Sequence, residues 1–132
     1  MDLIVCLDDD DGMKFNHRRQ SRDQKVITDI LNNLKGQNLY SDEESRILFP
    51  TDRSDIVYVS NLTDIEGYFF AESISNIPEE KNIDKLIIYR WNRRYPSDEK
   101  FPIQYDSLIK VSSVDFTGKS HEKITKEIYK RS

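Results

Sequence analysis

Four consecutive carboxylates, Asp8 to Asp11, stand shortly before a basic run at residues 17–19. Carboxylate oxygens on a loop that follows a strand can bind Mg²⁺ or Ca²⁺. Consecutive side chains of an extended segment point in alternating directions, so at most two of the four would reach one ion. The run also lacks the D-x-D-x-D-G spacing of a calcium loop. We therefore expect a solvated acidic loop, with a metal bound by Asp8, Asp9 and Asp10 as the weaker alternative.

The basic run His17, Arg18 and Arg19, with Arg22 close behind, is the first candidate binding site. Such residues could bind phosphate or cleave RNA, where histidine transfers the proton and arginine stabilises the developing charge. The helix expected after Ser21 would add backbone donors at its N-terminus. The competing interpretation pairs the arginines with the preceding aspartates, in exposed ion pairs worth about 0 to 1 kcal/mol. We favour the charged loop and keep phosphate binding as its functional alternative.

A second candidate is the segment YRWNRRYP, Tyr89 to Pro96. Its aromatic and arginine residues match the composition of interface hot spots and of platforms for single-stranded nucleic acid. Side chains alternate along a strand, so Arg90 is expected to point away from Trp91, and the simpler interpretation is a core strand with a basic exposed end. His121, near the other end of the chain, is expected at the surface. The candidate binding residues of this segment are Arg90, Trp91, Arg93, Arg94 and Tyr95.

Other catalytic chemistries find no pattern in the sequence. There is no P-loop, no Cys-x-x-Cys motif and no Ser-His-Asp order, and the four glycines are dispersed. The single cysteine, Cys6, lies in the apolar run LIVCL and is expected to be a buried hydrophobic residue. The sequence therefore predicts no catalytic residue and no cofactor.

Composition limits the remaining classes of function. A chain of 132 residues fits one domain, residues 1–132, and 36% hydrophobic residues suffice for a core. The net charge of -4 argues against direct binding of nucleic acid, which needs a basic surface. No apolar stretch approaches the roughly 18 residues of a membrane span, and the N-terminus lacks the pattern of a signal peptide. With one cysteine and no possible internal disulfide, we expect a cytoplasmic protein.

Two capping boxes predict helices. Ser21 with Gln24 would begin the first, which carries an apolar stripe and ends near Gly36. Ser41 with Glu44 would begin a shorter helix before Pro50. The stripe of the first helix consists of Val26, Ile27, Ile30, Leu31 and Leu34.

Apolar runs predict the strands of an α/β fold, a mixed sheet with few helices. The run at Leu3 to Leu7 is continuous, as in a strand buried on both faces. The last segment, from His121 onward, fits either a strand or a helix, because Ile124 and Ile128 keep both periods. The other predicted strands are Asp55 to Val59, Gly67 to Ala71, Lys85 to Trp91 and Asp106 to Phe116.

The two ends of the chain resemble dihydrofolate reductases. LIVCLDDDDGMKFN is similar to the family's first strand and loop, where an apolar strand leads into Asp, a Gly-Ile or Gly-Met pair and an Asn. IDKLIIYRW, YPSDEKFPI and SLIKVSSVDFTGKSHEKITKEIYKR are similar to its closing strand, D-x-x-FP loop and terminal hairpin. The resemblance covers about half the chain and implies a dihydrofolate-reductase-like sheet ending in a β-hairpin.

The residues that carry this family's chemistry do not match. HRRQS replaces the Leu-Pro-Trp segment before the substrate-binding acid, and Asp23, the only candidate for that acid, lies a few residues too early. After YFF, where the family has Gly-Gly at the cofactor pyrophosphate, this chain has Ala71 and Glu72. A Cβ keeps the backbone away from a pyrophosphate, and Glu72 would repel it. The Gly-Arg-Thr turn for the cofactor phosphates is also missing, so we expect a reduced scaffold without folate or NADPH chemistry.

The sequence also resembles a group of small bacterial proteins labelled ribonuclease Z. That label implies a dinuclear zinc site rich in histidines, whereas this chain has only His17 and His121, far apart in sequence. The resemblance therefore implies no zinc-dependent nuclease activity here.

These observations favour a non-catalytic protein-binding module. Its narrowest version is a mobile-element-encoded inhibitor of a nuclease or nucleoprotein complex, of the anti-CRISPR type, whose acidic segments at residues 8–11 and 42–44 complement a basic groove. The alternatives are a phosphodiesterase or ribonuclease that uses the loop of His17, Arg18 and Arg19, and a nucleotide-binding sensor. We expect a protein partner and no membrane association.

Overall fold

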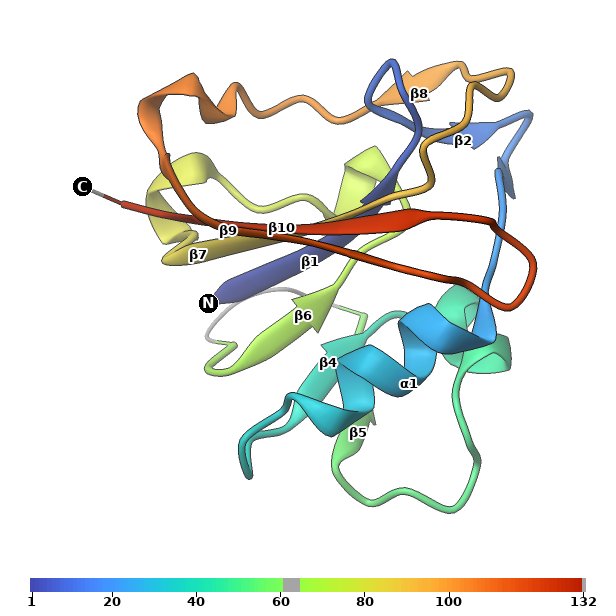
Figure 1. Ribbon diagram of the computed structural model, residues 1–132. Helices are drawn as coiled ribbons and strands as arrows, with labels where there is room; N and C mark the ends of the chain where they lie inside the picture. The colour runs from blue at the N-terminus through green and yellow to red at the C-terminus, as the bar shows by residue number, and fades with distance from the viewer. Residues whose placement is uncertain (61–64, 132) are drawn as a thin grey trace.

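A seven-stranded mixed sheet runs through the centre of the fold (Figure 1). The computed structural model describes residues 1–60 and 65–131. Across the sheet the strands are β5 (Ile56–Tyr58), β4 (Leu39–Ser41), β6 (Tyr68–Phe70), β1 (Asp2–Leu7), β7 (Lys85–Arg90), β10 (Ile124–Lys130) and β9 (Ile109–Phe116). The strands from β5 to β7 are parallel, and β10 and β9 are antiparallel to their neighbours. The predicted mixed sheet is confirmed.

A second, three-stranded antiparallel sheet follows β1 in the chain. The sequence did not predict it, because its strands are only two to four residues long and two of them are rich in charged residues. Its strands, in spatial order, are β3 (Arg18–Arg19), β2 (Gly12–Phe15) and β8 (Glu99–Lys100). The helices are α1 (Gln24–Asn32) and the short 3₁₀ turns η1 (Glu43–Leu48), η2 (Ile74–Asn76), η3 (Glu80–Asn82) and η4 (Tyr105–Ser107).

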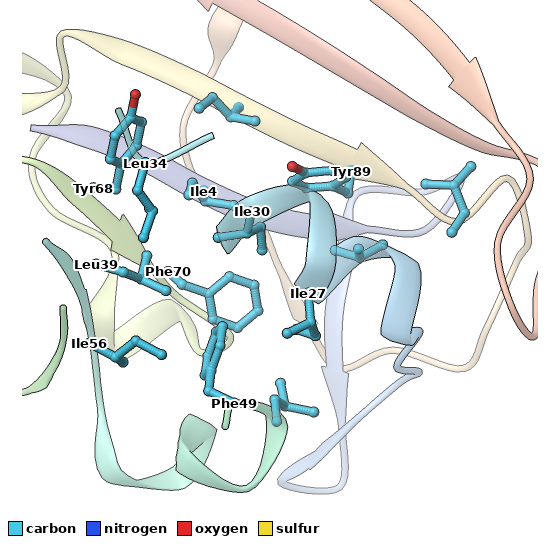
Figure 2. Packing of buried hydrophobic residues seen from close by; sticks show 14 of the residues in the cluster. Ile4, Ile27, Ile30, Leu34, Leu39, Phe49, Ile56, Tyr68, Phe70 and Tyr89 are labelled. Carbon is cyan, nitrogen blue, oxygen red and sulfur yellow. The ribbon is translucent and has the colours of Figure 1, made fainter. Parts of the chain in front are cut away.

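Both faces of the large sheet are buried, which explains the continuous apolar run of β1. Ile4 packs with α1 and η1 in one cluster, whereas Leu3, Val5 and Leu7 belong to the cluster on the opposite face. Figure 2 shows the first cluster, where residues of α1 lie against side chains from β1, β4, β6 and β7. The opposite face is covered by loops and 3₁₀ turns instead of a second long helix.

Helix α1 is capped by Asp23 and not by Ser21, which corrects the first predicted capping box. Asp23 Oδ1 accepts a hydrogen bond from the backbone N–H of Lys25 at 2.9 Å. Ser21 lies outside the helix, and its hydroxyl contacts His121 instead. The predicted apolar stripe is present, with its most buried members at Val26, Ile27 and Ile30.

The second capping box is wrong in the same way. Ser41 is the last residue of β4, and its hydroxyl donates to the carbonyl oxygen of Phe70 at 2.8 Å. Asp42 caps the following turn by accepting from the N–H of Ser45 at 3.0 Å. The predicted short helix is therefore the 3₁₀ turn η1.

Strands β9 and β10 form the terminal hairpin, so the ambiguous last segment is a strand. The pairing register of β9 with β10 shifts at Val111, which has no residue opposite it on β10. Figure 1 shows that the turn of this hairpin lies beside the chain that enters α1, and the backbone N–H of Lys119 donates to Asp23 across this contact. The fold thus brings residues about one hundred positions apart to the start of α1.

Candidate functional site

Asp8 organises the acidic loop from inside the protein. Its side chain is fully buried, so the prediction of a solvated loop is wrong for Asp8. It accepts hydrogen bonds from the backbone N–H groups of Asp10, Gly12 and Tyr95 at 2.9, 2.7 and 3.1 Å, and from Gln20 Nε2 at 3.2 Å. Because a buried carboxylate without partners is costly, these donors explain why an acidic residue is tolerated there.

The other carboxylates of the loop mostly pair with the segment Tyr89 to Pro96. Asp10 accepts from Arg94 Nε at 2.7 Å, and Asp11 accepts from Arg90 Nη1 at 2.6 Å. Asp9 is exposed. Within residues 1–60 and 65–131, no three His, Cys, Asp or Glu side chains are grouped as metal ligands. The loop is therefore held mainly by ion pairs and hydrogen bonds.

The basic run divides into one inward and several outward residues. Arg19 forms a two-bond pair with Glu72, both at 2.7 Å, and this hydrogen bonding raises the pKa of the guanidinium. His17, Arg18 and Arg22 are exposed. An open hollow of about 970 Å³ adjoins the run, and catalysis or nucleotide binding there stays a prediction. This hollow is lined by Lys14, His17, Arg18, Arg19, Glu44 and Ile47.

The aromatic and basic segment has a buried first part and an exposed basic end. Trp91 is 3% exposed and stacks on the His121 ring, with 4.6 Å between ring centroids. Arg90 donates to Asp11 and Glu127. In this state the side chain of Trp91 is not accessible as a stacking platform, whereas Arg93 and Arg94 are exposed.

His121 is buried, which corrects its expected place at the surface, and it connects three polar groups. Its Nε2 atom lies 2.9 Å from the Ser21 hydroxyl and 3.1 Å from the Tyr95 hydroxyl. Its Nδ1 atom lies 2.9 Å from Asp23 Oδ2. A serine, a histidine and an aspartate thus form a continuous hydrogen-bonded chain that the sequence analysis missed.

Asp23 is held as an ionised carboxylate. Burial raises the pKa of a carboxyl, but hydrogen bonds from Lys119, His121, Ser120 and Lys25 outweigh this and keep the pKa of Asp23 well below its usual value. The three backbone N–H donors lie at 2.8 to 2.9 Å. The carboxylate therefore joins the hairpin turn to the start of α1.

Two small hollows lie where the parallel strands β1, β6 and β7 end. Both are lined by Cys6, Ser21, Glu72 and Trp91, and each has room for about one water molecule. Open α/β sheets bind their ligands at this end of the strands. Each hollow is smaller than the roughly 300 to 1,000 Å³ of most small-molecule sites. Burial raises the pKa of the Cys6 thiol, which disfavours the reactive thiolate.

Comparison with solved structures identifies the architecture. The chain is similar to dihydrofolate reductase from Enterococcus faecalis complexed with NADP(H) and RAB-propyl, with a TM-score of 0.70. The alignment covers 98% of this chain and 95% of that one, at 13% sequence identity. The chain has a dihydrofolate-reductase-like fold. No family model matches the sequence, and no curated protein matches it either.

The dihydrofolate-reductase-like fold does not carry residues that fit its usual cofactor. Glu72 stands two residues after β6, where the resemblance places a glycine at the pyrophosphate, and its carboxylate binds Arg19 and the Ser45 hydroxyl. Ala71 before it is buried. This carboxylate and its partners stand where a pyrophosphate would need backbone donors, so the residues present do not fit NADPH.

Among the described residues, no helix has the length and apolar composition needed to cross a membrane.

Titration calorimetry with NADPH is therefore expected to give no saturable heat at ligand concentrations up to about 1 mM. Any binding would then be weaker than a Kd of about 1 mM, which corresponds to roughly 4 kcal/mol of binding free energy. The dihydrofolate reductase of Enterococcus faecalis, titrated under the same conditions, provides the positive control. A saturable isotherm with the present chain would show that Glu72 can be displaced by the cofactor.

Proposed function

We propose that this chain is a protein-binding module whose contact surface is the β9 edge, the side of Ile109–Phe116 that does not face β10. The supporting observation is exposed apolar surface on the outermost strand of the sheet. Ile109, Val111 and Val114 are 50%, 51% and 55% exposed. Among the described residues, no other strand pairs with β9 besides β10. An exposed apolar edge of this length is a template for pairing with another chain.

The proposed partner supplies an extended segment that adds to this edge. Its backbone would pair with the outward N–H and C=O groups of β9, and its apolar side chains would cover the exposed isoleucine and valines. The bulge at Val111 bends β9. A flat strand from another protein would therefore fit poorly along the whole length of β9. This shape favours a partner that matches a bent edge.

The interior of the fold supports a binding role better than a reductase role. The carboxylates of Asp8, Asp23 and Glu72 accept hydrogen bonds from groups of the chain itself. The hollows beside these groups are small. These three carboxylates are thus satisfied without a folate or a dinucleotide.

The narrower version of the proposal is an inhibitor of a nucleic-acid-handling complex, of the anti-CRISPR type. It needs carboxylates that can face a basic groove. Glu43 pairs with Arg46, and Glu44 pairs with Lys14. Asp10 and Asp11 also have internal partners, Arg94 and Arg90. This version therefore requires a partner whose cations compete with these internal ion pairs. Binding that weakens steeply with added salt would support it.

Affinity capture from the host cell tests the proposal. A tagged chain is compared with a variant carrying Val111→Lys and Val114→Lys, because lysine on an exposed edge opposes strand addition without removing core contacts. Ile47→Lys is the matched control, since Ile47 is 69% exposed and follows β4, near the opposite edge of the sheet.

We expect a stoichiometric partner with the wild type and with the control, and a loss of about tenfold in affinity, or roughly 1.4 kcal/mol, with the edge variant. Absence of any stoichiometric partner would contradict the proposal, as would equal capture by the edge variant. Size-exclusion chromatography of the pure chain shows whether the edge binds a second copy instead.

A further inference from the structure

A hydrogen-bonded series of three side chains has the connectivity of a nucleophilic serine site. Its members are Ser21, His121 and Asp23. Ser21 Oγ lies 2.9 Å from His121 Nε2, and His121 Nδ1 lies 2.9 Å from Asp23 Oδ2. A serine activated by a histidine that an aspartate orients can attack carbonyl carbon, and unrelated folds use this arrangement. Both contacts are at hydrogen-bonding distance, so the arrangement is built into the fold.

The surroundings of Asp23 decide which nitrogen of His121 carries the proton. The Asp23 carboxylate already accepts from the N–H groups of Lys25, Lys119 and Ser120. It can only accept, so a neutral His121 must donate from Nδ1 and keep the lone pair of Nε2 for the hydroxyl of Ser21. This is the tautomer that a general base requires.

Tyr95 contributes a second hydroxyl at the same point. Its oxygen lies 3.1 Å from His121 Nε2 and 3.5 Å from Ser21 Oγ. When Ser21 donates its proton to His121, the Tyr95 hydroxyl can turn toward the serine oxygen, because a hydroxyl rotates to suit its partners. Trp91, stacked on the His121 ring, keeps the ring in its plane.

Access to the site is one-sided. The side chains of His121 and Asp23 are 3% and 0% exposed, whereas Ser21 is partly exposed and lines both hollows. The first hollow is mostly apolar and has room for a group no larger than about a methyl. Apolar residues that line it are Val26, Ile27, Leu48, Phe70 and Trp91.

The second hollow is polar and has room for a single hydroxyl or water. It is lined by Arg19, Glu72 and Gln20, among others. The side-chain oxygen of Gln20 is buried and has no hydrogen-bond partner among the described residues. A hydroxyl on the alcohol part would satisfy it.

We propose that Ser21 is a nucleophile for acetate esters, with His121 as its general base and Asp23 as a positioning residue. Ser21 Oγ bonds to the ester carbonyl carbon while the bond from that carbon to the alcohol oxygen breaks. The hydroxyl proton passes to His121 Nε2 and then to the departing alcohol. Water repeats the same steps on the acyl-serine and releases the carboxylic acid. This site is separate from the proposed binding at the β9 edge.

Covalent labelling with diethyl p-nitrophenyl phosphate tests this proposal. The serine oxygen would bond to phosphorus, p-nitrophenolate would leave, and His121 would take the proton. We expect one equivalent of p-nitrophenolate per chain, with the diethylphosphoryl group mapped by peptide mass spectrometry to Ser21. Ser21→Ala should abolish labelling, and His121→Gln should slow it by about 10²-fold or more, the usual contribution of a general base.

Ser54→Ala is the matched control, because Ser54 is exposed and lies outside both hollows. Its labelling should equal that of the wild type. A folded wild-type chain that stays unlabelled, or carries the group on another residue, overturns the proposal. This mapping on the wild type decides the question even if a variant fails to fold.

Hydrolysis rates of esters with acyl chains of different length test the substrate class. With p-nitrophenyl esters, acetate should be hydrolysed faster than butyrate and laurate, whose chains exceed the first hollow, and Ser21→Ala should lose this difference. Equal rates for all three esters, or rates unchanged in Ser21→Ala, would overturn the assigned substrate class.

Discussion

Replacing Trp91 with alanine is expected to lower the free energy of unfolding by about 3 to 5 kcal/mol, the usual loss for a buried tryptophan. Trp91 is 3% exposed, belongs to the core cluster around α1 and stacks on His121. Its removal would leave a cavity between the two hollows and release the histidine ring. Urea denaturation followed by circular dichroism measures the change, as a lower midpoint at an unchanged slope.

Arg93→Ala is the control for Trp91→Ala, because Arg93 is an exposed residue of the same segment. Its effect should stay within about 0.5 kcal/mol. A similarly small effect for Trp91→Ala would mean that this side chain is not part of the core, and would return it to the role of a surface binding residue.

Replacing Asp23 with alanine should be comparably damaging, at about 3 to 5 kcal/mol, since it leaves several buried donors without their acceptor, at about 1 to 3 kcal/mol each. The substitution removes the cap of α1 and leaves the N–H groups of Lys119 and Ser120 without their acceptor. Asp42→Ala is the matched control, because Asp42 caps the 3₁₀ turn η1 and accepts from Asn76 but holds no hairpin turn, and it should cost about 1 kcal/mol. Equal losses for the two variants would show that the hairpin contact of Asp23 contributes nothing.

The pH dependence of stability gives a second readout for Asp23. Its pKa in the folded state lies below the unfolded value of about 3.8, so its contribution is present above that pH and is lost as the pH falls below it. Asp23→Asn removes the titrating group, so its unfolding free energy should fall less steeply below pH 4 than that of the wild type. Parallel curves for the two proteins would contradict the assignment.

The sequence predicted the large sheet well, because its strands are made by contiguous apolar residues. Leu3 to Leu7 has the continuous pattern of a strand buried on both faces, and it is the central strand β1. The terminal hairpin followed from the resemblance of the C-terminal segment. Local caps were predicted less well, since Ser21 and Ser41 both had hydroxyl partners elsewhere in the fold.

The serine site could not be predicted from spacing, because His121 is separated from Asp23 by 98 positions. Only the hairpin, whose turn reaches the start of α1, brings them together (Figure 1). The order Ser21, Asp23, His121 is visible in the sequence, but serine, aspartate and histidine are too common for an order alone to identify a site. The sequence signal that pointed in the right direction was the resemblance of the terminal hairpin.

The acidic and basic runs show why charge patterns alone say little about a binding surface. The sequence predicted a solvated loop in which the aspartates at residues 8–11 pair with the arginines that follow them at residues 18 and 19. In the fold, Asp10 and Asp11 pair with Arg94 and Arg90. Oppositely charged runs that look like separate surfaces in sequence thus neutralise one another across the fold.

Photo-crosslinking inside the host cell tests the central claim, binding at the β9 edge, most directly. A benzophenone amino acid is placed at Val111 on β9 in one version and at the exposed Arg93 in another. The proposal predicts one dominant crosslinked protein from position 111 and none from position 93. Crosslinks from position 93 with none from position 111 would contradict it.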